Sequence, residues 1–249
     1  PTHHDLQVKV FADGADIAGL SALAALPHIA GFTTNPTLMR KAGIEDYKLF
    51  AHEALAVIGD RPISFEVFSD EPREMIAQGR EIASWGENVY VKVPVSTTQG
   101  VSTADVVREL SHDGVQVNVT ALMTLAQVEE MTAAVQDGAE SNISVFAGRI
   151  ADTGRDPIPL MREALEIMAA VPTASLIWAS PREVLNIVQA DEIGCHIITV
   201  TYDLLAKLDG LAKPLDQFSL ETVQMFHRDA SAAGYTCLLY TSDAADDTP

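Results

Sequence analysis

The chain has 249 residues, enough for one large domain or two small ones, and 47% of them are hydrophobic. Its 16 basic and 35 acidic residues give a formal net charge of −19, which argues against nucleic acid or an anionic membrane as a partner. The two cysteines, Cys195 and Cys237, form neither a disulfide framework nor a metal-ligand pattern, and no apolar run is long enough to span a membrane. We therefore expect a cytoplasmic protein without a metal site.

Strand and helix patterns alternate along the whole chain. Strands are expected at residues 8–13, 31–35, 63–67, 89–93, 115–120, 142–147, 175–180 and 196–200. Helices are expected at residues 17–26, 46–58, 71–85, 103–112, 124–135, 157–170, 181–190 and 202–208, with a further amphipathic helix at 220–233. Eight βα units of this length predict an α/β fold, a single closed (β/α)8 TIM barrel with an extra C-terminal helix.

An open, doubly wound sheet is the alternative fold, but no glycine-rich phosphate loop follows the first strand. We expect residues 1–235 to form one catalytic barrel domain. Residues 236–249 resemble translated vector or adaptor sequence, and we expect them to be a non-native or disordered tail. A native acidic tail is the alternative for this segment.

One lysine is the most informative residue of the chain. Lys92 lies in Val-Tyr-Val-Lys-Val-Pro-Val, residues 89–95, which otherwise reads as a buried strand. Lysine is rarely buried, because desolvation penalises its ammonium form. The neutral amine is the form that attacks a carbonyl to make a Schiff base. The alternative is a structural lysine that pairs with a buried carboxylate or reaches out to the strand end.

Other polar residues share the side of their strands that Lys92 occupies. Alternation places Ser64 with Glu66, and Asn118 with Thr120, on faces opposite the apolar residues. Seven of the eight expected strands carry a polar residue toward their carboxyl ends: Asp13, Asn35, Glu66, Lys92, Asn118, Thr120, Ser144 and Ser180. Active sites of TIM barrels are built at the carboxyl ends of the strands, so these residues predict a polar site there. A purely structural polar belt is the alternative.

Two arginines follow late strands. Arg149 comes just after residues 145–148, and Arg182 just after residues 178–181. Loops at this position often bind phosphate in TIM barrels, and the guanidinium group donates two hydrogen bonds at once. The alternative is a surface ion pair, with Asp152 as the expected partner of Arg149.

From about residue 10 to residue 235 the chain resembles the transaldolase family in its short form, the subgroup that includes the fructose 6-phosphate aldolases. Six motifs occur in family order and spacing: Phe-Ala-Asp-Gly-Ala at 11–15, Thr-Thr-Asn-Pro at 33–36, Val-Lys-Val-Pro at 91–94, Asn-Val-Thr-Ala at 118–121, Gly-Arg-Ile-Ala-Asp at 148–152 and Ala-Ser-Pro-Arg at 179–182. Any one motif is weak, but six in order are specific.

The resemblance implies a cofactor-free enzyme that moves a dihydroxyacetone unit between sugar phosphates, as in the pentose phosphate pathway. Its implied catalytic residues are the Schiff-base lysine, two carboxylates for proton transfer and a threonine that shares a water with the second of them: Lys92, Asp13, Glu66 and Thr120. Its implied substrate-binding residues hold the hydroxyls or the phosphate: Thr33, Asn35, Asn118, Ser144, Phe146, Arg149, Ser180 and Arg182. Homo-oligomers are common among short relatives, so a homo-oligomer is expected.

Four positions at which family members differ concern the choice of reaction and substrate. Related fructose 6-phosphate aldolases carry Gln where Glu66 stands and Tyr where Phe146 stands, so both positions resemble the transaldolase choice. Gly14 replaces the usual Thr, and Val145 replaces a common Pro. An aldolase that releases dihydroxyacetone, or a transaldolase acting on sulfosugars, stays open as an alternative. A non-catalytic sugar-phosphate-binding barrel is the alternative from another class.

Overall fold

The computed structural model of the chain describes residues 5–235. These residues fall into two compact units that divide between Asp209 and Gly210. The expected tail at 236–249 lies outside the described residues. No helix within residues 5–235 is long and apolar enough to cross a membrane.

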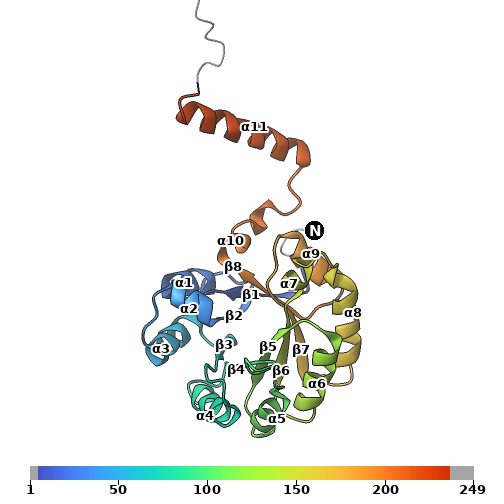
Figure 1. Cartoon of the computed structure of the whole chain (residues 1–249). Helices are drawn as coiled ribbons and strands as arrows, with labels where there is room; N and C mark the ends of the chain where they lie inside the picture. The colour runs from blue at the N-terminus through green and yellow to red at the C-terminus, as the bar shows by residue number, and fades with distance from the viewer. Residues whose placement is uncertain (1–4, 236–249) are drawn as a thin grey trace, which may run out of the picture. The chain divides into compact units, whose positions relative to one another are not determined.

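The first unit is a closed barrel of parallel strands, in which each strand pairs with the next along the chain and the last pairs with the first. The strands are β1 Lys9–Asp13, β2 Ile29–Thr33, β3 Ile63–Glu66, β4 Val89–Pro94, β5 Val117–Leu122, β6 Ser141–Val145, β7 Ala174–Trp178 and β8 Ile197–Thr201. The predicted TIM barrel is confirmed, and Figure 1 shows the strands converging in chain order. The open-sheet alternative is wrong, because β1 pairs with β8.

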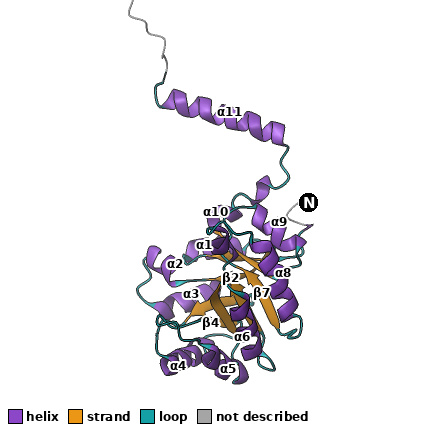
Figure 2. Cartoon of the chain, turned by 45° about the vertical axis from the view of Figure 1, so that its right-hand side comes forward, coloured by secondary structure: helices purple, strands orange, loops and turns teal. Residues whose placement is uncertain are grey.

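Helices alternate with these strands and cover the outside of the barrel (Figure 2). They are α1 Ile17–Ala24, α2 Pro36–Lys41, α3 Tyr47–Ile58, α4 Pro72–Ala83, α5 Ala104–His112, α6 Leu125–Val135, α7 Ala147–Ala151, α8 Pro157–Met168, α9 Leu185–Glu192 and α10 Tyr202–Leu205. The short helices α2 and α7 were not predicted from the hydrophobic pattern. Each has two turns or fewer, too short for a 3.6-residue periodicity to emerge.

The core lies mainly between the strands and the helices. Valines and isoleucines of the strands, such as Val91, Val93 and Val119, are fully buried against helix residues including Met75 and Leu110. A second, smaller cluster of Phe11, Ile177, Ala179 and Ile197 is packed separately from that layer. Because these side chains point opposite to the helix-facing ones, they form an apolar layer inside the barrel.

The second unit contains α11, Leu215–Ala232, which begins five residues before the helix expected at 220–233. Pro214 immediately precedes this helix, and Asp216 lies in its first turn, near the positive end of the helix dipole. Lys213 forms an ion pair with Glu221. Several large apolar side chains of α11 are exposed, including Phe218, Val223 and Phe226.

One glycine controls a close approach at the carboxyl ends of β6 and β7. A β-carbon on Gly148, in α7, would lie 1.5 Å from the backbone oxygen of Ser180. The Gly148 amide donates a hydrogen bond of 3.3 Å to the carbonyl of Ala179, and Ser180 itself has a left-handed φ of 55°. The absence of a side chain at 148 therefore allows the start of α7 to contact the loop after β7.

We predict that Gly148→Ala destabilises the barrel by about 2 kcal/mol or more, because the added methyl group overlaps backbone that cannot rotate away. Chemical denaturation measures this change in the free energy of unfolding. Gly210→Ala is the matched control, since nothing described lies within 4 Å of a β-carbon there and its φ is not left-handed. Equal stability of the two variants would contradict the assignment of Gly148 to a close approach.

Candidate active site

The strand register brings three of the predicted site residues into one row. Glu66 on β3 is the cross-strand partner of Lys92 on β4, and Lys92 is the partner of Asn118 on β5. Side chains at paired positions of parallel strands point to the same face of the sheet. Glu66, Lys92 and Asn118 therefore share the inner face of the barrel. Glu66 ends β3 and Lys92 lies two residues before the end of β4, whereas Asn118 is the second residue of β5.

Lys92 is buried, with 7% of its surface exposed. Its Nζ donates a hydrogen bond of 3.0 Å to the carbonyl oxygen of Thr34 and lies 3.9 Å from Oε2 of Glu66. The burial of Lys92 excludes the alternative of a lysine that reaches out to the strand end. The alternative of a lysine paired with a buried carboxylate fits the nearby Glu66, as does a reactive amine. At 3.9 Å the two groups attract each other without a direct hydrogen bond, so the Nζ retains capacity for another partner.

Asp13 ends β1 and faces the same interior. Its carboxylate accepts a hydrogen bond of 2.9 Å from the Thr33 hydroxyl and a longer one of 3.5 Å from the Asn35 amide. Burial raises the pKa of Asp13, and the charge of Lys92 and the two hydrogen bonds oppose that rise. A carboxylate with a raised pKa can exchange protons closer to neutral pH than an ordinary aspartate.

Glu66 has a pKa raised in the same direction. Burial is the largest cause, the charge of Lys92 opposes it, and the charge of Asp13 adds to it. Two carboxylates and one lysine therefore influence each other electrostatically within a single desolvated region. Such a combination of burial and specific charge partners is characteristic of catalytic sites.

Polar side chains of β3, β5 and β6 form a connected set beside Lys92. Ser144 donates a hydrogen bond of 2.7 Å to Asn118 Oδ1, and the Asn118 amide donates one of 2.9 Å to Ser64 Oγ. Thr120 is also buried, but its hydroxyl has no hydrogen-bond partner within residues 5–235. An orphan buried hydroxyl is costly, so this atom is suited to a water or a substrate group.

The carboxyl-end loops of β7 and β8 add a cavity of about 380 Å³ that Asp13, Ser180 and Arg182 all line. The exposed guanidinium of Arg182 pairs with Asp152, its Nε lying 3.0 Å from Oδ1. This pairing raises the pKa of Arg182 and lowers that of Asp152, and the charge of Arg149 also lowers the latter. Arg149 itself lies 5.9 Å from the centre of the Phe146 ring.

The ion pair at Asp152 corrects one sequence-based alternative. The alternative of a surface ion pair is found, but the arginine that pairs with Asp152 is Arg182 and not Arg149. The path of the loop after β7 explains the difference. This loop approaches α7 at Gly148, which brings Arg182 to the end of that helix, where Asp152 lies. The pair is about half exposed on both sides, so it is worth little and an anion can compete for the arginine.

Three predicted site residues lie past the ends of their strands and not within them. Asn35 is the N-cap of α2, where its Oδ1 accepts a hydrogen bond of 2.9 Å from the amide of Leu38. Phe146 precedes α7, and Ser180 lies in the left-handed turn after β7. Asn35 therefore has two roles, since its oxygen caps a helix while its amide reaches Asp13.

Tyr202, the first residue of α10, lies near the site but was not predicted from the sequence as a site residue. A β-carbon on Gly14 would lie 2.2 Å from the Tyr202 ring, and one on Gly19 would lie equally close. The ring thus fills the volume that a threonine at position 14 would need, which explains the departure noted there. The Tyr202 hydroxyl is buried without a partner among the described residues, and burial, with the charges of Asp16 and Asp13, raises its pKa. The only sequence signal was Gly14 itself.

No group of three or more His, Cys, Asp or Glu residues within residues 5–235 is arranged to hold a metal ion. The lysine, carboxylates and hydroxyls at the barrel mouth are the groups available for chemistry there. The expectation that the protein needs no cofactor stays a prediction.

The chain is similar to known proteins in both sequence and structure. Residues 10–237 match the family model described as Transaldolase/Fructose-6-phosphate aldolase. A "Probable transaldolase" of Dehalococcoides mccartyi is 34% identical over 202 residues, covering 81% of this chain and 90% of the relative. One from Methanococcus maripaludis strain C5 is 31% identical over 223 residues, covering 86% and 99%.

Solved structures with similar folds are more distant in sequence. A crystal structure from Burkholderia cenocepacia J2315 superposes with a TM-score of 0.56 at 16% identity, covering 86% of this chain and 96% of that one. The crystal structure of KGPDC from Streptococcus mutans gives a TM-score of 0.52 at 11% identity, covering 79% and 88%. These likenesses establish the barrel fold alone.

The sequence match spans nearly all of the barrel, including Asp13, Glu66, Lys92 and Arg182. The chain is thus a carbohydrate-metabolism enzyme, a transferase of the class I aldolase type, and it belongs to the transaldolase/fructose-6-phosphate aldolase family.

Proposed function

We propose that this enzyme transfers a dihydroxyacetone unit from a ketose phosphate to an aldose phosphate through a Schiff base on Lys92. Fructose 6-phosphate and sedoheptulose 7-phosphate are the proposed donors. The observation that carries the proposal is the buried Nζ of Lys92, 3.9 Å from the carboxylate of Glu66 and electrostatically coupled to Asp13. A simple sugar-phosphate-binding barrel has no need of a desolvated lysine that interacts electrostatically with two carboxylates.

The proposed reaction begins when the Lys92 amine attacks the ketose carbonyl, and loss of water gives a protonated imine. Asp13 then takes the proton of the hydroxyl next to the breaking carbon–carbon bond, and the bond electrons move to the iminium and leave an enamine. The first aldose phosphate departs. The enamine attacks the carbonyl of the second aldose, and Asp13 returns its proton to the oxygen of that carbonyl, which gives the imine of the product. Water then hydrolyses the imine, which releases the product and restores Lys92.

The remaining residues have supporting roles in this proposal. Glu66 assists the water and proton transfers through a water shared with Thr120, whose hydroxyl has no other partner among the described residues. Thr33, Asn35, Asn118 and Ser144 hold the three-carbon unit, and Phe146 covers it. Ser180, Arg182 and Arg149 hold the phosphate at a distance from the reacting carbons, where binding energy serves to orient the substrate.

Two further features are proposed with the function. The enzyme works in the cytoplasm, and it forms a homo-oligomer. Helix α11 carries large apolar side chains such as Phe218 and Phe226, and we propose that a second copy of the chain packs on them. Residues 1–235 would act together as the catalytic unit.

We expect borohydride to trap fructose 6-phosphate on the wild-type enzyme and not on Lys92→Met. The reduced adduct appears as a mass increase on the peptide that contains Lys92. Lys48→Met, which removes an exposed lysine paired with Glu81, is the control and should trap normally. Trapping on Lys92→Met to the wild-type extent would exclude the mechanism. The absence of any adduct on wild type would favour a non-catalytic binding barrel.

We expect sedoheptulose 7-phosphate to form from fructose 6-phosphate only when erythrose 4-phosphate is present. Chromatographic product analysis with and without the acceptor makes the distinction. Free dihydroxyacetone and glyceraldehyde 3-phosphate without an acceptor would instead indicate an aldolase, and turnover of sulfosugars alone would exclude phosphate as the preferred group.

We predict that Arg182→Ala raises the KM for fructose 6-phosphate about tenfold or more and leaves activity with unphosphorylated fructose unchanged, because a charge-assisted hydrogen bond to phosphate is lost. Steady-state kinetics with both sugars measures the difference. Arg80→Ala is the matched control, an exposed arginine that also pairs with carboxylates. Equal losses with both sugars would remove Arg182 from the phosphate site.

We predict that kcat/KM falls on the acid side at a pH above the ordinary aspartate range. Asp13 must be ionised to act as the base, and burial raises its pKa, so the active form is lost as pH falls through the raised value. Thr33→Val removes a hydrogen bond that lowers this pKa and should move the acid limb to higher pH. Thr132→Val, at a buried hydroxyl of α6 that has no partner among the described residues, should leave the limb in place.

A further inference from the structure

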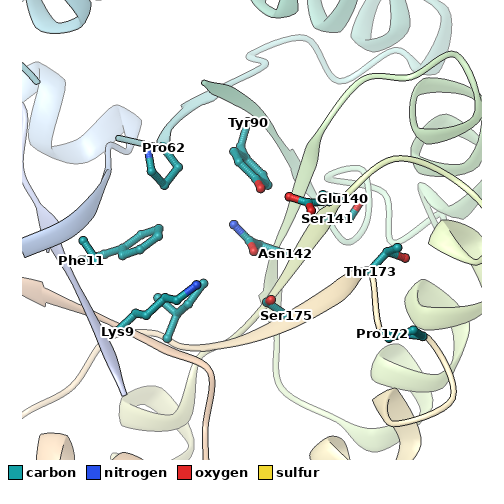
Figure 3. A pocket seen from close by; sticks show the side chains of 12 residues that line it. Lys9, Phe11, Pro62, Tyr90, Glu140, Ser141, Asn142, Pro172, Thr173 and Ser175 are labelled. Carbon is teal, nitrogen blue, oxygen red and sulfur yellow. The ribbon is translucent and has the colours of Figure 1, made fainter. Parts of the chain in front are cut away.

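A second cavity, of about 300 Å³, lies at the opposite end of the barrel from Lys92. Its lining comes from the first residues of the strands and from the turns just before them: Lys9, Phe11, Ala30, Pro62, Tyr90, Glu140, Ser141, Asn142, Pro172, Thr173, Ser175 and Ile197. Figure 3 shows the side chains of Lys9 and Asn142 pointing into this space beside Phe11, Tyr90 and Ser175.

This cavity is separate from the candidate active site. The apolar cluster of Phe11, Ile177, Ala179 and Ile197 lies between the two ends of the barrel, and Phe11 and Ile197 also line the cavity. Tyr90 is two residues before Lys92 on β4, on the same strand face. The barrel interior therefore has a polar layer at each end with an apolar layer between them.

Asn142 is the strongest sign that the cavity takes a ligand. Only 4% of its surface is exposed, yet its side-chain amide makes no hydrogen bond within residues 5–235. The amide atoms are not among the fully enclosed unpartnered atoms of the described residues, so they are accessible from the cavity and can bond to water or to a ligand group there. Figure 3 shows that amide facing the open space and not the surrounding side chains.

The charges around the cavity are complementary to a zwitterion. Lys9 has no ion pair among the described residues, although the chain carries a net charge of −19. Glu140 lies beside Tyr90, and burial together with the charge of Glu140 and a hydrogen bond to it raises the pKa of Tyr90 to about 12. Tyr90 therefore stays protonated, and Glu140 supplies the negative charge of the cavity. Phe11, Pro62 and Ile197 provide apolar wall.

We propose that this cavity binds a free α-amino acid with a small apolar side chain. The ligand carboxylate accepts hydrogen bonds from Lys9, Asn142 and Ser175, its ammonium group faces Glu140, and its side chain packs on Phe11 and Pro62. The volume is at the lower end of the range for small-molecule sites, which suits an occupant of this size. A dianion such as phosphate fits poorly, because Glu140 repels it.

The test uses L-valine as the probe, titrated into the whole protein and followed by calorimetry and by ligand-observed NMR. Saturable binding to wild type is expected, with at least about tenfold weaker binding to Asn142→Leu and to Lys9→Met. Lys92→Met should bind L-valine as wild type does, which separates this cavity from the candidate active site. Loss of L-valine binding in Lys92→Met but not in Asn142→Leu would overturn the proposal.

Two analogues test the zwitterion specifically. Isovalerate lacks the ammonium group of valine and isobutylamine lacks the carboxylate, so each should bind at least about tenfold more weakly than L-valine. Isovalerate binding as tightly as L-valine would remove the role of Glu140. Tighter binding of inorganic phosphate than of L-valine would make the cavity an anion site and would likewise overturn the proposal.

The stability of unliganded Asn142→Leu separates a ligand site from a structural one. Leucine has a similar volume and removes the unpartnered amide, so the melting temperature without ligand should stay unchanged or rise. A structural role through fixed internal waters would instead lower the melting temperature. A fall in melting temperature, with wild-type binding of L-valine, would contradict the proposal even if turnover is unaffected.

Discussion

The burial of the Lys92 amine is the constraint on which the rest of the site depends. An ammonium group removed from water needs compensating charge and hydrogen bonds, and the barrel supplies the Thr34 carbonyl and the Glu66 carboxylate. The neighbouring acids are desolvated in turn, so burial raises the pKa values of Glu66 and Asp13 while the lysine limits the rise. The arrangement of Lys92, Glu66 and Asp13 therefore determines the protonation of the groups at the barrel mouth, and with it the chemistry that they can perform.

The strand register explains why so much of this site could be predicted. Side chains alternate with a period of two, so Glu66, Lys92 and Asn118 had to share a face once β3, β4 and β5 were assigned. The closed barrel then placed that face inside, as β1 pairs with β8. The six short motifs identified the family, and the sequence comparison confirmed it over residues 10–237.

Other features depend on contacts between loops, which no local pattern encodes. The pairing of Arg182 with Asp152 follows from the approach of Ser180 to Gly148, two residues that are far apart in the chain. The contact of Tyr202 with Gly14 joins the last strand's loop to that of the first, and only barrel closure brings them together. Helices α2 and α7 were missed because each is too short to show a periodicity, although Asn35 has the residue type of an N-cap.

The two ends of the barrel interior differ in how their polar groups are satisfied. At the carboxyl end, Asn118, Ser64 and Ser144 bond to one another, and Asp13 accepts from Thr33 and Asn35, so the geometry is held before substrate arrives. At the amino end, the amide of Asn142 has no such partner among the described residues. A preorganised network reduces the reorganisation that a reaction requires. The carboxyl end also keeps the enclosed hydroxyls of Thr120 and Tyr202 without a partner among the described residues, which suits a site that bonds to water or substrate. At the amino end the open group is an amide that lines a cavity, so its bonding capacity is directed at whatever fills that cavity.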